Sequence, residues 1–140
     1  MRRLFGTDGI RGIVNEELTP ELAYKLGRAI IGYFGDIRGK KVIIGSDTRS
    51  SKDMLKSALI AGLTSGGLDV LDVGIIPTSA LSYLVTLDSE VILGIMLSAS
   101  HNPVEYNGIK IFKNNGFKLE DNVEEIVEDY IRKDDNYFRA

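Results

Sequence analysis

Cysteine is absent from this 140-residue sequence, and histidine occurs once, at His101. Without cysteine the chain can hold neither a disulfide framework nor a metal site built from thiolates. A zinc site would need carboxylates for all its other ligands, and protein zinc sites are rarely built that way. Disulfide-stabilised and zinc-dependent functions are therefore disfavoured.

The sequence also lacks a basic excess and a long apolar run. Its formal net charge is −3 at pH 7, whereas a nucleic-acid surface normally carries a strong positive excess. No apolar stretch is long enough to span a membrane, and the N-terminal residues lack the apolar core of a signal peptide. We therefore expect a cytoplasmic protein that binds neither nucleic acid nor membrane.

Length and composition favour a single globular domain. A chain of 140 residues with 44% hydrophobic and 26% charged residues can bury a stable core without disulfides or structural metal ions. Strand and helix patterns alternate along it, which is typical of an α/β fold. Periodicity predicts helices over residues 20–34, 51–65, 78–87 and 121–132, and strands over 41–45, 68–73, 90–97, 109–113 and 117–119.

Cap and turn residues mark the ends of several of these elements. Thr19 and Gly35 suit the start and the end of the first helix. Ser50 or Ser51 opens the second helix, and Thr78 is a candidate cap for the third.

The order of the elements predicts the sheet. Repeated strand–helix–strand units imply right-handed crossovers and parallel strands. Asn114-Asn115-Gly116 is a hairpin signal that adds an antiparallel pairing. We predict a mixed, mostly parallel sheet flanked by helices in one domain.

The last predicted helix carries a cluster of acidic residues. We interpret this cluster as a solvated helix face; it comprises Glu120, Asp121, Glu124, Glu125, Glu128 and Asp129. Helical spacing predicts that the apolar side chains face inward, namely Val123, Ile126, Val127, Tyr130 and Ile131.

Polar segments follow three of the predicted strands, at residues 46–50, 74–78 and 98–103, and the glycine-rich residues 6–12 can join them. Ligands of open α/β sheets gather beyond the carboxyl ends of the parallel strands. These segments offer hydroxyls, arginines and glycine amides, and such groups suit a phosphorylated ligand. The pattern therefore predicts an α/β domain that handles phosphate.

Ser100 is the candidate nucleophile, because a serine hydroxyl can carry a phosphoryl group when a base and a cation lie nearby. The alternative is a polar turn in which Ser100 and Asn102 only satisfy backbone groups. A serine hydrolase is less favoured, because Ser100 and His101 are adjacent and no Gly-x-Ser-x-Gly elbow is present.

The charged candidates each have a structural alternative. Arg11 either clamps phosphate or decorates a hairpin. Asp47 and Arg49 either line the site or form a local pair that caps the following helix. Lys110 alternates with apolar residues, so it either serves the site or lies on the solvent face of a strand.

The same segments resemble the α-D-phosphohexomutases. Phe5-Gly6-Thr7-Asp8-Gly9-Ile10-Arg11-Gly12 is similar to the N-terminal signature of that family, and Ser98-Ala99-Ser100-His101-Asn102-Pro103 is similar to its phosphoserine loop. Gly45-Ser46-Asp47-Thr48-Arg49 and Gly74-Ile75-Ile76-Pro77-Thr78 resemble two further loops in the same order. Ser79 stands where the family often has a second proline.

The resemblance implies a reaction and roles for these residues. Ser100 would bear the phosphoryl group, with Mg²⁺ against its phosphate and a hexose 1,6-bisphosphate as intermediate and activator. His101 and Lys110 would take part in proton transfer, and Arg11 would support the site electrostatically. The remaining candidates, Thr7, Asp47, Arg49 and Asn102, would bind substrate or its phosphate.

The resemblance also bears on substrate and extent. It favours interconversion of glucosamine 6-phosphate and glucosamine 1-phosphate, with the mannose and glucose phosphates as the alternative and a homodimeric full-length enzyme. Residues 1–140 correspond to the first of four family domains, and no Asp-Gly-Asp-Gly-Asp metal loop is present. We expect this domain to be inactive alone. A non-catalytic phosphate-binding module and a dimerisation module remain the alternatives from other classes.

Overall fold

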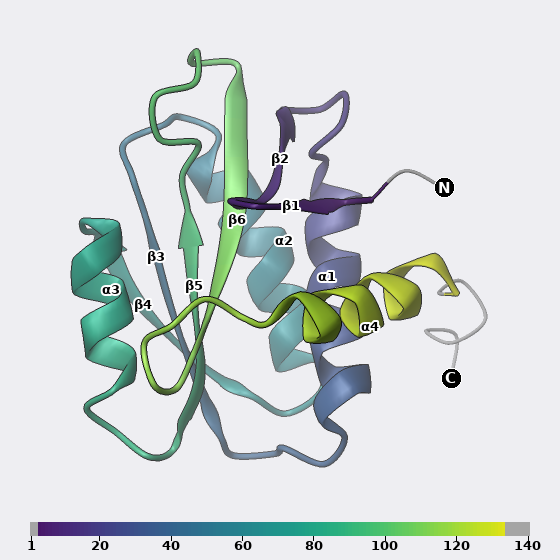
Figure 1. Cartoon of the computed structure of the whole chain (residues 1–140), viewed down its shortest axis with the longest axis vertical. Coiled ribbons are helices and arrows are strands. Elements are labelled where there is room, and N and C mark those ends of the chain that lie inside the picture. Colours follow the sequence, from purple (N-terminus) through teal and green to yellow (C-terminus); the bar gives the residue numbers. More distant parts are fainter. Residues whose placement is uncertain (1–2, 134–140) are drawn as a thin grey trace.

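A computed structural model describes residues 3–133 of the chain. These residues form a six-stranded sheet in the order β1-β2-β6-β5-β3-β4, and β3, β5 and β6 run up and down the view in Figure 1. The strands are β1 (Phe5–Gly6), β2 (Gly9–Ile13), β3 (Lys41–Ser46), β4 (Asp69–Ile75), β5 (Val91–Leu97) and β6 (Tyr106–Lys113). The helices are α1 (Pro20–Phe34), α2 (Lys52–Thr64), α3 (Thr78–Val85) and α4 (Asp121–Arg132).

The predicted mixed α/β sheet flanked by helices is confirmed, although its pairing is less parallel than predicted. β3 pairs in parallel with β4 and β5, whereas the pairs β5–β6, β6–β2 and β2–β1 are antiparallel. In direction, β2, β3, β4 and β5 all run the same way. The difference arises in part because β2 pairs with β6, which lies far from it in the sequence, and no local pattern reveals such a pairing.

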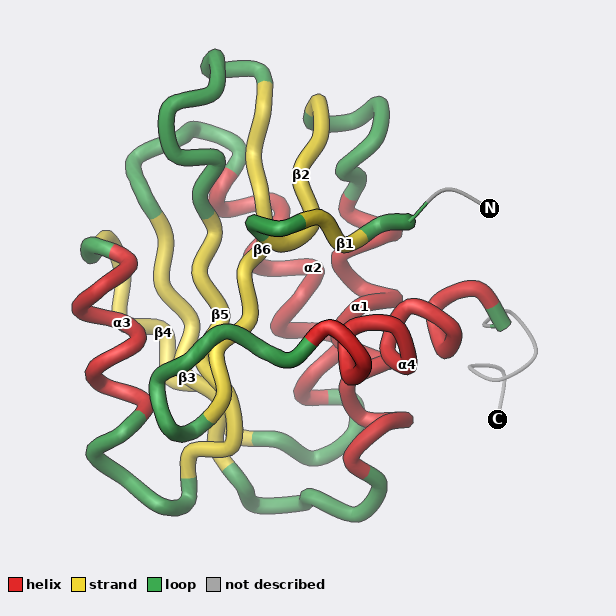
Figure 2. Tube along the Cα trace, viewed as in Figure 1, coloured by secondary structure: helices red, strands yellow, loops and turns green. Residues whose placement is uncertain are grey.

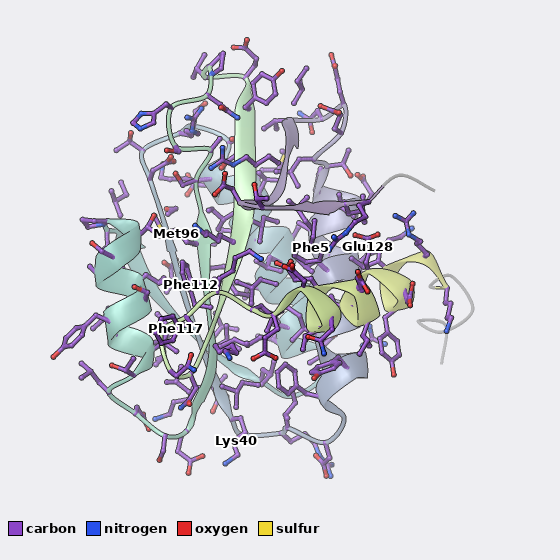
Figure 3. All side chains as sticks on the ribbon, in the orientation of Figure 1. Phe5, Lys40, Met96, Phe112, Phe117 and Glu128 are labelled. Carbon is purple, nitrogen blue, oxygen red and sulfur yellow. The ribbon has the colours of Figure 1, made fainter. Side chains whose placement is uncertain are left out.

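The helices cover the two faces unequally. Helices α1, α2 and α4 pack over one face, and α3 covers part of the other. Strand alternation separates two cores accordingly: Val42 and Ile44 lie in the larger core, and Ile43 lies under α3. Figure 3 shows Met96 and Phe112 on the α3 side as well.

Local signals set several element ends. The Thr19 hydroxyl accepts a hydrogen bond from the Leu22 N–H at 3.1 Å, and Gly35 ends α1 with φ 78°. The residue before α2 is Ser51, but its hydroxyl does not cap the helix. The residue before α3 is Pro77, so the predicted capping role of Thr78 is wrong; Thr78 is the first helical residue, and α3 ends at Val85 rather than at residue 87.

The predicted turn at residues 114–116 is confirmed, with Gly116 at φ 86°. The Lys113 N–H bonds to the Phe117 carbonyl at 2.8 Å. The predicted returning strand over 117–119 is reduced to one bridge between Phe112 and Lys118.

Helix α4 departs from the prediction on both of its faces. Ile126 is 41% exposed, whereas Glu124 and Glu128 are only 1% and 6% exposed. The Glu128 carboxylate accepts hydrogen bonds from the N–H groups of Leu4 (2.8 Å) and Phe5 (3.1 Å), and Figure 3 shows it beside Phe5. The acidic cluster is therefore not wholly a solvated face, because part of it anchors the start of β1.

Candidate active site

The four polar segments meet at one end of the sheet. Figure 2 shows the loops that follow β3 and β5 together at the top of the view. A cavity of about 210 Å³ opens there, and its lining contains residues from three of the segments and from β5 and β6: Asp8, Arg11, Thr78, Met96, Ser98, Ser100 and Lys110. The predicted convergence of these segments on Ser100 is therefore a feature of the fold.

Ser100 lies in the connection between β5 and β6, which we call the Ser100 loop (residues 98–105). Its φ is 55°, in the left-handed region that side-chain-bearing residues rarely adopt. The Ser98 hydroxyl accepts a hydrogen bond from the Ser100 N–H at 3.0 Å, and the Asn102 N–H bonds to the Ala99 carbonyl at 3.0 Å. Such backbone strain is typical of functional sites.

The base of the Ser100 loop is closed by close backbone contact. The Ser98 N–H bonds to the Gly108 carbonyl at 3.0 Å, and a Cβ at Gly108 would lie 2.6 Å from the Ser98 carbonyl oxygen. Asn107 is fully buried. Its amide accepts from the Gly108 N–H at 2.8 Å and donates to the Ser51 hydroxyl at 2.9 Å. The loop is thereby tied to the start of α2.

Lys110 projects into the cavity from β6. Its neighbours Ile109 and Ile111 point into the larger core, so alternation directs Lys110 and Phe112 to the opposite face. The Lys110 Nζ lies 4.0 Å from Asp8 Oδ1 and 5.7 Å from the centre of the Phe112 ring. Lys110 therefore lines the same cavity as Ser100, and its role there stays a prediction.

Arg11 reaches the same cavity from β2, where it pairs opposite Gly108. Its Nε is buried and has no hydrogen-bond partner within residues 3–133. A buried guanidinium N–H with no acceptor suits an anion that enters the cavity. The role of Arg11 as a phosphate clamp stays a prediction.

The remaining predicted residues lie around this centre. His101 and Thr7 are exposed and are not part of the cavity lining. Asp47, Arg49 and Asn102 line a more open groove of about 670 Å³ on the other side of Ser100. Asp47 and Arg49 do form an ion pair, at 3.2 Å, but the guanidinium contacts the Ser100 loop rather than capping α2.

Three cavity residues carry no functional signal of their own in the sequence. Asp8 belongs to a turn signal, Ser98 to a motif centred on Ser100, and Met96 to an apolar strand. Ser98 is detectable in principle, since a serine two residues before a left-handed residue can accept its N–H. The approach of Asp8 to Lys110 depends on the β1–β2 turn folding over β6, which carries no local signal.

Within residues 3–133 no cluster of three or more histidine, cysteine or carboxylate side chains is arranged to hold a metal. No helix in this part of the chain is long and apolar enough to cross a membrane.

Comparison with known families decides the relationship. The model of the phosphoglucomutase/phosphomannomutase family, alpha/beta/alpha domain I, matches residues 2–138. The chain belongs to this family. Phosphoglucomutase/phosphomannomutase domain I is thus the fold described above, and the resemblance seen in the four motifs is confirmed.

Curated members of the family share extensive identity with the chain. It is 76% identical over all its residues to a phosphoglucosamine mutase of Dictyoglomus turgidum, and covers 31% of that protein. It is 58% identical to a phosphoglucosamine mutase of Clostridioides difficile, with 94% of the chain and 29% of that protein covered. The chain therefore spans less than a third of the length of these relatives.

Solved structures from the family match the fold. A putative phosphomannomutase from Thermus thermophilus superposes with a TM-score of 0.82 at 33% identity, covering 91% of this chain and 29% of that one. A phosphoglucomutase/phosphomannomutase family protein from Burkholderia thailandensis gives a TM-score of 0.76 at 30% identity, covering 93% and 30%.

Proposed function

We propose that the chain is the phosphoserine-bearing domain of a mutase that interconverts glucosamine 6-phosphate and glucosamine 1-phosphate. The observation that carries the proposal is the position of Ser100, held in a left-handed conformation on a cavity that also receives Arg11 and Lys110. The names of the relatives with 76% identity support the amino sugar as substrate.

In the proposed reaction, phosphorylated Ser100 donates its phosphoryl group to one sugar hydroxyl. The bond between Ser100 Oγ and phosphorus breaks, and a bond between the sugar oxygen and phosphorus forms. The proton of the sugar hydroxyl passes to a base, and the freed Ser100 oxygen takes up a proton. The resulting bisphosphorylated sugar reorients in the site and transfers its other phosphoryl group to Ser100. Each complete cycle leaves the enzyme phosphorylated and the sugar phosphate isomerised.

Cationic groups in the cavity stabilise the transferring phosphoryl group. Lys110 and Arg11, whose Nε has no hydrogen-bond partner within residues 3–133, line the cavity in which we propose that negative charge develops. Lys110 lines the same cavity as the proposed nucleophile, and its Nζ lies 4.0 Å from Asp8 Oδ1. We assign Lys110 to proton transfer, and His101 on the exposed part of the Ser100 loop is the alternative.

The oxygen donors near Ser100 fit Mg²⁺ only in part. Hydroxyl, phosphate and carboxylate oxygens are the ligands that Mg²⁺ prefers. The carboxylate that lines the cavity, Asp8, is next to Lys110, so the cavity alone is an incomplete site. We propose that the Ser100 phosphate supplies one ligand and that parts of the protein outside this domain supply the others. When bound, Mg²⁺ would neutralise charge on the transferred phosphoryl group.

The other domains of the mutase are likewise part of the proposal. The chain covers 31% of its relatives, so a complete enzyme would add the sugar-reading and metal-binding parts. The isolated domain is then predicted to be inactive alone. The homodimeric state and the cytoplasmic location stay predictions.

A second substrate class is favoured by the structural neighbours. The Thermus protein is named a putative phosphomannomutase, so mannose or glucose phosphates are the alternative substrates. A kinetic comparison of glucosamine, mannose and glucose 6-phosphates with the full-length enzyme separates these. A kcat/KM highest for glucosamine 6-phosphate supports the proposal.

Intact mass and peptide mapping of the full-length protein purified from cells test the nucleophile. We expect one phosphate on Ser100, and none in the Ser100→Ala variant. Ser89→Ala is the matched control, since Ser89 is exposed in the loop before β5, at the other end of that strand from Ser100, and should not alter the modification. An unmodified Ser100 that also resists hexose 1,6-bisphosphate would favour a non-catalytic phosphate-binding module. Dimerisation without any ligand response would favour a dimerisation module.

A further inference from the structure

Arg49 uses its whole guanidinium within the protein. The side chain has five N–H donors and no acceptor. Its Nε donates to Asp47 Oδ2 at 3.2 Å. Its other donors bind backbone carbonyls: Nη1 those of Pro103 (2.7 Å) and Tyr106 (3.0 Å), and Nη2 those of Ser100 (3.0 Å) and Asn102 (2.8 Å).

These carbonyls extend from the proposed nucleophile to the first residue of β6. One planar group therefore fixes the path of the Ser100 loop over most of its length. The Arg49 side chain is only 11% exposed, so water competes little for these donors. Lysine cannot take this role, because its three donors radiate from one nitrogen rather than from a planar fork.

Arg49 is itself held in place from β5. The Asp47 carboxylate accepts from both the backbone N–H (3.1 Å) and the Nε of Arg49. The Asp47 N–H bonds to the carbonyl of Leu97, the last residue of β5, at 3.0 Å. The sheet therefore positions Asp47, Asp47 positions Arg49, and Arg49 positions the Ser100 loop.

The backbone of Ser100 is consequently fixed on both sides. Its N–H is bound by the Ser98 hydroxyl and its carbonyl by Arg49. Two hydrogen bonds that flank one residue restrict its φ and ψ together, and this residue is the one with φ 55°. A left-handed serine needs such support, because its own conformational preference opposes it.

We infer that Arg49 is a positioning residue that holds Ser100 in its reactive conformation, rather than a ligand of the substrate phosphate. That this conformation is the reactive one rests on the proposed function. That Arg49 holds the loop rests on the hydrogen bonds alone. A substrate phosphate could bind Arg49 only by displacing loop carbonyls. This assignment replaces the phosphate-binding role expected from the sequence.

The test compares Arg49→Lys with the wild-type full-length enzyme. We expect the rate of Ser100 phosphorylation by glucose 1,6-bisphosphate to fall about 100-fold, as for a misplaced reacting group. The KM for the sugar phosphate should change by less than about threefold, because no substrate contact is lost. Native-state hydrogen exchange of the Ser100 and Asn102 amides should become at least about tenfold faster.

Arg38→Lys is the matched control. Arg38 also follows an aspartate by two residues and bonds to it, with Nε 3.0 Å from Asp36 Oδ1. Its side chain is 77% exposed and lies far from the Ser100 loop in sequence and fold. This variant should leave both the phosphorylation rate and the exchange of the loop amides unchanged.

The outcomes separate the inference from the proposed function. A raised KM with an unchanged phosphorylation rate and unchanged exchange in Arg49→Lys would make Arg49 a substrate ligand and overturn the inference. If wild-type Ser100 accepts no phosphate, the proposed function fails, and the exchange comparison alone decides whether Arg49 holds the loop. Should Arg49→Lys not fold, Arg49→Gln replaces it, with faster exchange at the same two amides expected and unchanged exchange overturning the inference.

Discussion

Ser98 and Ser100 of the same loop are joined by a hydrogen bond of 3.0 Å, in which the Ser98 hydroxyl accepts from the Ser100 N–H. The first serine thus supports the backbone of the second, which has φ 55°. The two hydroxyls of the motif therefore have different tasks, one in shaping the turn and one in the proposed chemistry.

The Ser98→Ala variant tests the shaping task. Loss of the acceptor should slow Ser100 phosphorylation by about 10- to 100-fold, because the nucleophile is displaced rather than removed. Stopped-flow measurement with hexose 1,6-bisphosphate on the full-length enzyme gives this rate. Ser98→Thr keeps the hydroxyl and should restore most of it. Equal rates in wild type and Ser98→Ala would show that the hydrogen bond is dispensable.

The Ser100→Ala variant tests the chemical task. We expect mutase activity to be lost while the melting temperature stays within a few degrees or rises, since alanine removes the nucleophile from an exposed loop position and buries nothing new. Activity is measured with glucosamine 6-phosphate and unfolding by calorimetry. Appreciable turnover in the folded variant would remove Ser100 from the nucleophile role.

Glu128 should stabilise the fold in a pH-dependent way. Burial raises the pKa of its carboxyl, but hydrogen bonds from Arg132 and from the N–H groups of Phe5 and Leu4 outweigh burial, and the net pKa is lowered. Its stabilisation is therefore full above the unfolded pKa of about 4.3 and is lost as pH falls through the folded value. Glu128→Gln should lower the free energy of unfolding by about 1–2 kcal/mol near neutral pH.

Urea unfolding of wild type and Glu128→Gln from neutral pH to below pH 4 measures this difference. The gap between the two should close toward the acidic end. A constant gap across the range would mean that the ionisation of Glu128 contributes nothing to stability.

Glu124, one turn earlier in α4, should behave in the opposite way. Burial raises the pKa of its carboxyl, and the hydrogen bond from Lys118 offsets this only in part. Its Oε2 is buried without a hydrogen-bond partner within residues 3–133. Near neutral pH the ionised group therefore costs stability, and the cost disappears as pH falls through the raised pKa toward the unfolded value.

The Glu124→Gln variant should consequently be more stable than wild type near neutral pH, by about 1 kcal/mol. The gain should vanish in acid, where wild-type Glu124 is protonated. Glu125→Gln is the control, because Glu125 is exposed on the same helix and should change little. A less stable Glu124→Gln at neutral pH would mean that the Lys118 ion pair outweighs the burial.

Local chemistry accounts for what the sequence predicted correctly. Thr19, Gly35 and Gly116 act on backbone within a few residues, so their patterns identify one cap and two chain reversals. The change from apolar to polar residues predicted the ends of β3 and β5, and with the end of β5 the position of Ser100. Residue type also drew attention to Arg11 and Lys110, which line the same cavity as Ser100, and their roles there stay predictions.

What the sequence could not predict depends on contacts between distant residues. The carboxylate of Glu128 meets the N–H of Phe5 across 123 positions, and the Arg49 guanidinium meets the Tyr106 carbonyl across 57. A glutamate on an acidic helix is expected to be solvated. An arginine in a polar motif is expected to bind a ligand. Their actual partners are backbone groups, which carry no residue-specific signal.

The Ser100 loop joins two strands that are hydrogen-bonded to each other, since β5 pairs with β6 directly below it. The ends of the loop cannot separate unless the hydrogen bonds between β5 and β6 break, and Asn107 bonds one end to the start of α2. Ser100 is therefore held at one position relative to the sheet. In the proposed reaction both ends of the sugar must reach Ser100. The sugar, and any part of the enzyme that encloses it, must therefore reorient while Ser100 stays in place.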